Sequence, residues 1–354
     1  MYDIIIVGLG PAGAVFARSL DSRFSVLAID RKKEREGFRK PCGGLLAPDA
    51  QKELASLGLN LPKGILVDPQ IFSVRTIDLD NSLIRNYQRM YINLDRHKFD
   101  MWLIESLPEN IERAEGVVTG IEKTDKGYRV TYISEGEEKT ACSRFIVGAD
   151  GAKSAVRRLI CPRFKIRKYL SVQQWFREEN PVPFYSCVFD SRNTDCYSWT
   201  ISKDGYFIFG GAYPVKGARE AFERQKQRLS AIGMKLGEPV KTEACQVLRP
   251  KGLKSYCTGK DGAFLIGEAA GFISPSSLEG ISSAVISGIK LGETFNSASE
   301  NLNRAYNRRV LSLKIKLSLK NLKCPFMYEP WIRRLVMKSG ITAIDVKGGN
   351  NLKL

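Results

Sequence analysis

Apolar residues near the start of the chain form short unbroken runs, the pattern of strands that are buried on both faces of a parallel sheet. The first run covers residues 3–7 and the second covers residues 24–29. Residues 14–20, between the two runs, have the composition of a helix. The order strand, helix, strand predicts the first unit of an α/β fold.

The turn after the first run carries a complete G-x-G-x-x-G pattern, with glycines at Gly8, Gly10 and Gly13. Gly8 permits the tight turn, Gly10 lets the backbone approach a pyrophosphate, and Gly13 lets the helix pack on the strand. Asp30 closes the second run, about 20 residues on, where a carboxylate would accept hydrogen bonds from a ribose diol. This order predicts a site for an adenine dinucleotide, FAD or NAD. The alternative is a glycine turn in an unrelated α/β unit.

Two later stretches favour FAD over NAD. Residues 145–154 contain an apolar strand that ends in an Asp-Gly turn at Asp150, and residues 263–271 contain another that reaches Gly267 and Glu268. Either stretch alone fits any strand-turn-helix unit. Together with the N-terminal loop, they resemble the three fingerprints of the flavoprotein hydroxylase and reductase superfamily, which implies FAD as the cofactor.

Four shorter segments resemble geranylgeranyl reductases. Residues 40–44 resemble the Cys-Gly-Gly segment that these enzymes place beside the flavin ring, and residues 93–100 resemble a segment whose arginine touches the cofactor. Residues 197–203 resemble a Tyr-x-Trp substrate-cavity motif. Residues 278–281 resemble a turn whose amides face the pyrimidine edge of the flavin.

These resemblances imply a set of site residues. The implied cofactor-binding residues are Gly8, Gly10, Ala12, Gly13, Asp30, Arg31, Cys42, Gly43, Gly44, Arg96, Val118, Asp150, Gly267, Glu268, Gly280 and Ile281. The implied substrate-binding residues are Tyr197 and Trp199. Cys42 is the candidate catalytic residue and would act as a proton donor. The alternative is that Cys42 serves only as a small side chain on a cofactor loop.

The match is most specific for the CbrA-type branch of FAD-binding oxidoreductases. Its pattern covers residues 40–51, 181–190, 196–214 and 264–283. The chain departs from the reductase pattern at Glu268, where the reductases have aspartate, and at Leu278, where they have glycine. Ile201 and Ser202 replace a Phe-Pro pair. These departures put the identity of the substrate in doubt more than the FAD site.

The cofactor motifs lie far apart in sequence, so we expect a discontinuous Rossmann-like FAD-binding domain of the α/β class. The segments between the motifs are rich in aromatic and β-branched residues with turn residues between them, which predicts an inserted antiparallel β-sheet substrate domain of α+β type. The boundaries we expect are 1–70, 94–160 and 256–300 for the FAD-binding domain, 71–93 and 161–255 for the substrate domain, and 301–354 for a basic helical C-terminal segment.

Charge is concentrated towards the C-terminus. The 354 residues carry a formal net charge of +17, and residues 301–339 hold ten basic residues and one acidic residue. Residues 311–319 alternate between apolar and polar positions with the period of a strand. Apolar residues four apart in this stretch also share one face of a helix, and the resemblance implies a helix. One interpretation is a solvated basic helix, and the other is a partly apolar flank that rests on anionic lipid. Nucleic acid fits less well, because no binding motif accompanies the charge.

The sequence predicts a protein that stays in the cytoplasm, with a peripheral position at the inner face of the membrane as a further expectation. No run approaches the ~18 apolar residues of a membrane-spanning helix, and no signal peptide is recognisable. The eight cysteines include no C-x-x-C pair and are expected to stay reduced. With His97 as the single histidine, a metal site or a histidine-based triad is not expected.

We therefore expect an FAD-dependent oxidoreductase that reduces carbon–carbon double bonds of an isoprenoid or another apolar lipid by hydride transfer from reduced flavin. An FAD-dependent monooxygenase of an aromatic or lipid substrate, and a redox-sensing flavoprotein without turnover, are the alternatives. No second glycine pattern exists, so the electrons would come from docked NAD(P)H or from a partner such as ferredoxin. Five aromatic residues would line an apolar slot or belong to the core: Tyr185, Tyr197, Trp199, Phe207 and Phe209.

Overall fold

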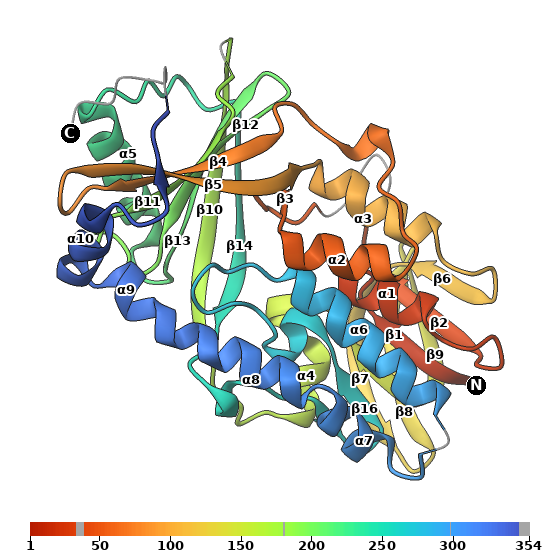
Figure 1. Cartoon of the computed structure of the whole chain (residues 1–354). Coiled ribbons are helices and arrows are strands. Elements are labelled where there is room, and N and C mark those ends of the chain that lie inside the picture. Colours follow the sequence, from red (N-terminus) through yellow and green to blue (C-terminus); the bar gives the residue numbers. More distant parts are fainter. Residues whose placement is uncertain (33–38, 180, 298, 347–354) are drawn as a thin grey trace.

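The computed structural model describes residues 1–32, 39–179, 181–297 and 299–346. Two large β-sheets with helices around them make up this part of the chain (Figure 1). The far end of the predicted C-terminal segment, residues 347–354, lies outside the described residues.

The first sheet is mainly parallel and has the strand order β15-β16-β9-β1-β2-β6, with β8 and β7 continuing from β9. Its strands are β1 (Tyr2–Val7), β2 (Val26–Asp30), β6 (Ile111–Glu115), β7 (Val117–Thr124), β8 (Gly127–Ser134), β9 (Glu137–Gly148), β15 (Gly259–Lys260) and β16 (Ala263–Leu265). Val7 pairs with Ile29 on one side and with Gly148 on the other. This register brings the turns at Gly8, Asp30 and Asp150 to one edge of the sheet.

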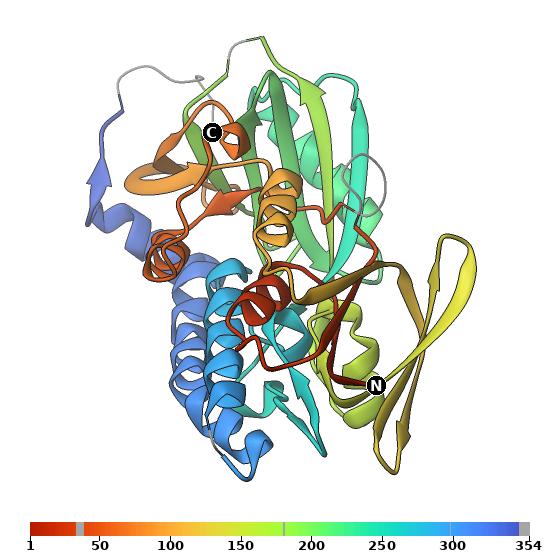
Figure 2. The same cartoon turned by 90° about the vertical axis from the view of Figure 1, so that its right-hand side faces the viewer.

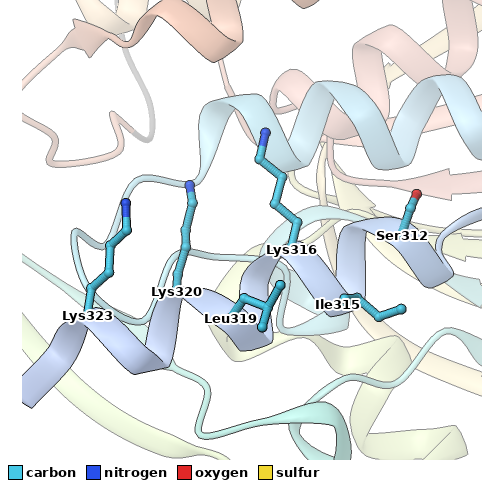
Figure 3. Close-up of a pocket in the computed structure, with 6 residues that line it drawn as sticks. All are labelled: Ser312, Ile315, Lys316, Leu319, Lys320 and Lys323. Carbon is cyan, nitrogen blue, oxygen red and sulfur yellow. The ribbon is translucent and has the colours of Figure 1, made fainter.

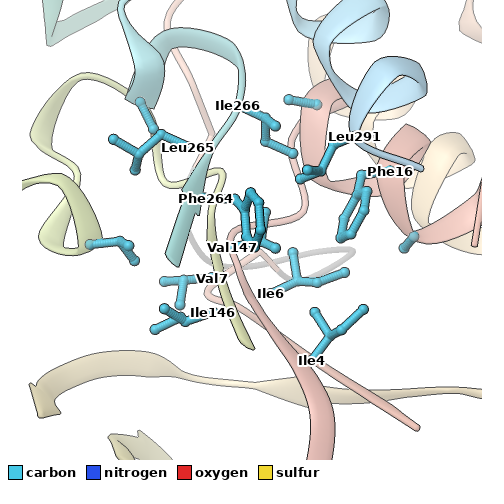
Figure 4. Close-up of a cluster of buried hydrophobic side chains, with 14 of the residues drawn as sticks. Ile4, Ile6, Val7, Phe16, Ile146, Val147, Phe264, Leu265, Ile266 and Leu291 are labelled. Carbon is cyan, nitrogen blue, oxygen red and sulfur yellow. The ribbon is translucent and has the colours of Figure 1, made fainter. Parts of the chain in front are cut away.

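Long-range packing assembles this sheet from both ends of the chain. Helices α1 (Pro11–Arg18) and α6 (Ile281–Asn296) pack against each other beside it. The core between helices and sheet joins Ile4 and Ile6 to Phe16, Phe264 and Leu291, all fully buried (Figure 4). The predicted discontinuous α/β arrangement is confirmed.

The second sheet has the order β14-β10-β13-β12-β11-β4-β5-β17, and β3 also pairs with β5. Its strands are β3 (Leu45–Leu46), β4 (Ile71–Asp78), β5 (Leu83–Asn93), β10 (Arg167–Arg177), β11 (Phe184–Phe189), β12 (Ser198–Lys203), β13 (Tyr206–Pro214), β14 (Lys241–Arg249) and β17 (Ala343–Ile344). Helix α5 (Ala218–Ala231) covers one face, where Phe222 stacks on Phe209 at 5.0 Å between ring centroids.

The expectation of an antiparallel second sheet is wrong at one pair, because β4 and β11 run parallel. Residues 71–93 form a hairpin, and β4, the first strand of that hairpin, is the one that meets β11. Hydrophobic alternation marks a strand and its faces but not its direction, so this pairing left no signal.

Smaller helices position the loops at the sheet edges. They are α2 (Pro48–Ser56), α3 (Arg96–Glu105) and α4 (Ala155–Ile160), with 3₁₀ turns η1 (Lys63–Ile65), η2 (Gly151–Lys153), η3 (Leu253–Ser255), η4 (Gly267–Ala270) and η5 (Lys320–Lys323). Asp95 caps α3 by accepting hydrogen bonds from two backbone N–H groups of its first turn.

The C-terminal segment is helical, as predicted, and spans both sheets. Its helices are α7 (Leu302–Arg309), α8 (Leu311–Leu319), α9 (Cys324–Tyr328) and α10 (Pro330–Ser339). At the α7 end, the buried Tyr306 hydroxyl donates to the carbonyl of Leu265 in the first sheet at 3.1 Å. At the α10 end, Arg333 pairs with Asp78 of the second sheet at 2.8 Å. Figure 2 shows these helices along one side of the molecule, away from the hairpin of β7 and β8.

Cys161 and Cys257 form a disulfide, which differs from the expectation that all thiols stay reduced. The two cysteines are 96 residues apart in sequence, and the packing of α4 beside β15 brings them together. No short-range spacing could have announced the pair. Within the described ranges, no helix is long and apolar enough to cross a membrane.

Candidate functional site

The glycine loop after β1 has two glycines that the protein itself requires and one that leaves open space. Gly8 has φ +97°, and a Cβ on Gly13 would lie 2.0 Å from the carbonyl oxygen of Gly8. A Cβ on Gly10 would meet no atom within 4 Å. Gly10 therefore borders the volume in which a pyrophosphate is expected, whereas Gly8 and Gly13 serve the turn and the helix.

The Asp30 carboxylate lies beside this loop and is already engaged by the protein. It accepts hydrogen bonds from the backbone N–H groups of Leu9 and of Lys32. The buried Lys32 ammonium lies 3.2 Å from Asp30 and 3.8 Å from Asp100. A ribose diol at Asp30 would share the carboxylate with these donors. Lys32 was not predicted, because its pairing with Asp100 forms only when α3 packs beside the loop.

Two other predicted cofactor residues lie around Asp30. Gly116 donates its N–H to the Asp30 carbonyl at 2.8 Å, which brings the half-buried Val118 at the start of β7 to the same end of the sheet. Arg31 is exposed at the end of β2. Val118 therefore lies close to the end of β2, and the Arg31 side chain is exposed there.

The second motif lies against the first. The Asp150 carboxylate accepts a hydrogen bond from Ala155 N–H at 2.6 Å through one oxygen, while its other oxygen is buried without a partner. Burial raises the pKa of Asp150. A buried carboxylate oxygen without a donor is costly, so a donor from a bound ligand would fit this position.

The backbone of the third motif packs against side chains of the other two. A Cβ on Gly267, which has φ +56°, would lie 2.9 Å from the Ala12 Cβ. The buried Arg157 guanidinium donates to the carbonyl of Ala269 at 2.8 Å. Arg157, another residue that was not predicted, thus ties the second motif to the third by satisfying carbonyls of the 3₁₀ turn η4.

Glu268 is directed towards the segment that precedes Cys42. Its carboxylate pairs with Lys40 at 2.7 Å and accepts the N–H of Leu248 at 2.9 Å. Burial lowers the pKa of Lys40, but the charge and hydrogen bond of Glu268, together with Cys245, raise it by more, so the net shift is upward. The extra methylene of glutamate, relative to the aspartate of reductases, gives the carboxylate reach to hold this segment.

The Cys42-Gly43-Gly44 segment bends sharply beside α3. Gly44 has φ +64°, and a Cβ there would lie 2.4 Å from the Leu94 carbonyl oxygen. The Cys42 sulfur accepts the N–H of Gly44 at 3.4 Å. Burial lowers the pKa of Arg96, whereas Asp100, at 2.8 Å, and Cys42 raise it, and the net shift is upward. Cys42 and Arg96, each expected to lie beside the cofactor, are thus brought together.

A buried lysine that the sequence did not single out supports this segment. Lys203 donates to the carbonyl of Leu94 at 2.7 Å and to the amide oxygen of Asn93 at 2.5 Å. Its ammonium also reaches the Gly44 carbonyl at 3.5 Å. Burial among uncharged acceptors lowers the pKa of Lys203 to about 8.

The Trp199 indole lies between the second sheet and the glycine pair of this segment. A Cβ on its strand partner Gly210 would lie 2.7 Å from the ring, so only glycine leaves room there. The Trp199 Nε1 is buried and has no hydrogen-bond partner, and a Cβ on Gly43 would lie 3.8 Å from it. An unpartnered N–H beside Gly43 fits a bound group with an acceptor.

Tyr197 lies next to Trp199, with ring centroids 6.0 Å apart. Its hydroxyl donates to the Ser277 carbonyl at 2.6 Å and accepts from Tyr185 at 3.2 Å. Both tyrosine hydroxyls are therefore satisfied, and their rings supply an apolar wall.

The predicted slot does not include Phe207 and Phe209. Phe209 is fully buried against α5, and Phe207 packs against the same cluster. Successive side chains of a strand point to opposite faces, so these two residues and Trp199 lie on different sides of the sheet. The interpretation of Phe207 and Phe209 as slot residues is wrong.

The turn before α6 completes the site. Gly280 is the N-cap of α6, and Ile281, its first residue, packs in a buried cluster with Ala14 and Val15 of α1. Leu278 has φ +51°, the left-handed conformation that favours the glycine found there in reductases. Three features thus fit a dinucleotide cofactor: the open space at Gly10 and the two unpartnered buried atoms of Asp150 and Trp199.

Known proteins resemble this chain in sequence and in fold. Residues 105–313 match the model of the FAD binding domain family. A CbrA protein from Escherichia coli O6:H1 is 49% identical over 346 residues, which cover 97% of this chain and 94% of that protein.

Two solved structures share the fold. The geranylgeranyl bacteriochlorophyll reductase-like protein from Thermoplasma acidophilum superimposes with a TM-score of 0.76 at 18% identity, over 93% of this chain and 87% of that one. Klebsiella pneumoniae HpxO, complexed with FAD and uric acid, superimposes with a TM-score of 0.66 at 14% identity, over 96% and 92%. At these identities the likeness concerns the fold alone.

Proposed function

The chain belongs to the CbrA family and carries an FAD-binding domain, and from this premise we propose that it is an FAD-dependent reductase that saturates carbon–carbon double bonds of an isoprenoid or related lipid. Reduced FAD supplies a hydride when it is bound. The remaining tasks fall to the residues of the chain: holding the cofactor, presenting an apolar substrate and delivering a proton.

The residues around the glycine loop would hold the dinucleotide. The N-terminus of α1 and the open space at Gly10 favour a pyrophosphate, because backbone N–H groups there have no helical partner. The unpartnered Asp150 oxygen would accept a hydrogen bond from a hydroxyl of the cofactor. Asp30 would do the same for the ribose, in competition with its own contacts to Lys32.

The observation that carries the choice of substrate is the aromatic wall beside the Cys42-Gly43-Gly44 segment. Tyr185, Tyr197 and Trp199 form one buried cluster. The hydroxyls of both tyrosines are paired, so the only polar group that this wall offers is the Trp199 N–H. Such a surface suits a long hydrocarbon with few polar atoms better than it suits a charged metabolite.

Cys42 is the candidate proton donor. Addition of a hydride to one carbon of a double bond leaves an electron pair on the other carbon, which must take a proton. The Cys42 thiol would supply that proton, and the neighbouring Arg96 guanidinium would stabilise the thiolate that remains. A thiol at this position can donate its proton to a substrate that carries no charged group.

The electron donor would be NAD(P)H or a reduced protein such as ferredoxin, docked transiently. To test the reaction, we would reduce the purified holoprotein without oxygen and incubate it with a geranylgeranyl-bearing glycerolipid. We expect mass spectrometry to show products that have gained one H₂ per double bond. Trp199→Phe, which keeps a ring but removes the N–H, should lower turnover while FAD stays bound, and Trp102→Phe in α3, outside the aromatic wall, is the matched control.

An FAD-dependent monooxygenase is the second candidate, supported by the shared fold with HpxO, whose structure holds uric acid, an aromatic molecule. Oxygen-dependent consumption of NAD(P)H with a hydroxylated product would favour this alternative. A flavoprotein that senses redox state without turnover would give neither product. If the lipid is recovered unchanged under anaerobic reduction, reductase function is contradicted.

A further inference from the structure

The C-terminal helices expose a row of large apolar side chains. The side chain of Leu319 is 57% exposed, that of Leu322 67% and that of Trp331 65%. These residues belong to α8, η5 and α10 in turn. The whole row consists of Leu311, Ile315, Leu319, Leu322, Phe326, Trp331 and Leu335, and we call it the C-terminal apolar row. An exposed leucine on its own is ordinary, but seven large apolar residues within 25 positions need a reason.

The row is not needed for folding of the helices that carry it. Leu313 and Leu317 of α8 are almost fully buried against the core of the first sheet. They lie on the inward face of α8, whereas Leu311, Ile315 and Leu319 lie on its outward face. The helix therefore has one apolar face that packs and a second that no described residue covers.

Basic side chains flank the row. Lys316, Lys320 and Lys323 line an open hollow on α8 and η5 together with Ile315 and Leu319 (Figure 3). In the close-up, the three ammonium groups point to the same side of the helix. Lys316 also pairs with Asp49 at 2.9 Å, but both side chains are half exposed, so this pair would exchange readily for another anion.

Further along the row, the structure changes the charge count suggested by the sequence. Arg333 is buried against Asp78 and does not face solvent. Arg334 and Lys338 of α10 are exposed, and Glu329 is the single acidic residue of residues 301–339. The outward surface of the segment thus combines apolar side chains with a clear excess of positive charge.

We propose that the C-terminal apolar row and its flanking lysines dock this protein on an anionic lipid bilayer. Leucine, phenylalanine and tryptophan side chains would enter the boundary between headgroups and acyl chains, while the lysines would reach the lipid phosphates. A second copy of the chain is a poorer occupant, because it would oppose one basic surface with another. A solvated face would need no row of apolar residues.

The docking surface adjoins the candidate substrate site through α9. Phe326 of α9 is 57% exposed in the row, whereas Tyr328, two residues on, packs on Phe189 at 5.8 Å between ring centroids. The Tyr328 hydroxyl also donates to the Ser276 carbonyl, in the turn that holds Tyr197. The short helix α9 therefore separates the proposed docking surface of the protein from the aromatic wall. This inference goes beyond the proposed reaction and does not depend on it.

The test is co-sedimentation of the full-length FAD-loaded protein with vesicles, read out by flavin fluorescence in the pellet. Vesicles of phosphatidylcholine alone are compared with an equimolar mixture of phosphatidylcholine and phosphatidylglycerol, at about 0.1 M and about 1 M salt. We expect binding to the anionic vesicles at the lower salt concentration, and a loss of about tenfold or more at the higher one.

Two variants separate the contributions. Leu319→Ser, Leu322→Ser and Phe326→Ser together remove apolar side chains, and Lys316→Gln, Lys320→Gln and Lys323→Gln together remove charge. Each should weaken binding about tenfold or more and leave bound FAD and the melting temperature unchanged, because none of the altered side chains is buried.

The control variant carries Lys123→Gln, Lys126→Gln and Arg129→Gln in the hairpin of β7 and β8, which lies on the opposite side of the molecule (Figure 2). It loses the same charge and should bind like the wild type. Absence of binding to anionic vesicles, or equal weakening by the control, overturns the proposal. So does a dimer in solution that the apolar variant dissociates, because a second copy would then cover the row. Failure of lipid reduction would leave these results unaffected.

Discussion

Gly10 and Gly13 belong to one loop but are required for different reasons, and substitution should separate them. Gly10→Ala places its Cβ in open space, so the apoprotein should fold with an unchanged melting temperature and lose FAD affinity at least about tenfold. Gly13→Ala forces a Cβ to within 2.0 Å of the Gly8 carbonyl and should destabilise the apoprotein itself. Thermal unfolding of the apoprotein and titration with FAD measure the two effects.

Gly58, where a Cβ would also meet nothing within 4 Å, is a less useful control because its φ is +67°. Gly64 offers the same open space without that restriction. Gly64→Ala should therefore change neither property. Full FAD affinity in Gly10→Ala would contradict the placement of a pyrophosphate at this loop.

The buried Lys203 should make stability depend on pH. Burial lowers its pKa from 10.5 to about 8, so between these values the unfolded chain binds a proton that the folded chain has released. Stability then rises with pH across this window and is smaller below it. We expect the free energy of unfolding of the wild type, relative to Lys203→Met, to rise by at most ~1.4 kcal/mol per pH unit there.

Chemical unfolding at several pH values measures this difference. Lys123→Met, at an exposed position, is the control and should track the wild type. A difference between wild type and Lys203→Met that stays constant from pH 7 to pH 10 would show that Lys203 titrates normally.

For single residues, the short motifs were predictable from the sequence, but the residues that hold these motifs in place were not. The glycine loop and Asp150 come together as expected from local patterns, and Cys42 lies beside Arg96. Lys32 and Lys203 were missed because their burial depends on distant segments: Asp100 of α3 lies beside Lys32, and Asn93 at the end of β5 accepts from Lys203. A buried lysine is recognisable only when its acceptors are known.

At the level of elements, the period of the hydrophobic pattern identified most helices and strands. It was ambiguous where a helical period and a strand period both fit the same residues. Residues 311–319 fit both a strand and a helix, and α8 is a helix because Leu313 and Leu317 reach the core from one face. β14 (Lys241–Arg249) went unpredicted because its sequence mixes charged, polar and apolar residues without alternation. It forms because β10 offers it a complete edge for pairing.

The attachment of α10 centres on the buried Arg333, which pairs with both Asp78 and Asp80. Arg333 contacts Asp78 through two hydrogen bonds at 2.8 Å and 2.9 Å, and both side chains are almost fully buried. Arg333→Ala leaves the carboxylate without its partner and should lower the free energy of unfolding by about 3–5 kcal/mol. Denaturant unfolding measures the loss, and the exposed Arg334→Ala should stay within about 0.5 kcal/mol of the wild type.

The same ion pair determines how the stability of the protein changes at low pH. Burial raises the pKa of Asp78, but the hydrogen bonds from Arg333, Asn81 and the Asp80 backbone, together with the charge of Arg333, give a net lowering. Stability from this carboxylate is therefore present above its unfolded pKa and is lost as pH falls through the lowered value. Arg333→Ala should remove that part of the acid sensitivity. Equal stability of the Arg333 and Arg334 variants would contradict the anchoring of α10.

For the whole molecule, FAD should stabilise the fold as a unit. The candidate cofactor contacts come from the glycine loop, from Cys42 to Gly44, and from the turns at Asp150 and Gly267, which span most of the chain. Free FAD at 100 times its Kd should add about 2.7 kcal/mol to the free energy of unfolding. Calorimetry with increasing FAD should show one transition that moves to higher temperature. Two transitions, of which FAD moves only one, would contradict this coupling.

The packing of α1 against α6 also determines the order of events during synthesis. α1 ends at Arg18, and its partner α6 ends at Asn296, so almost the whole chain must be made between them. At ~5–20 residues per second, this delay is on the order of tens of seconds. Throughout that time Val15 and Phe16, buried in the finished protein, have no α6 to cover them. The nascent chain therefore presents an apolar surface that a ribosome-bound chaperone would recognise, and the cofactor loop, although made first, gains the support of α6 only after most of the chain has been made.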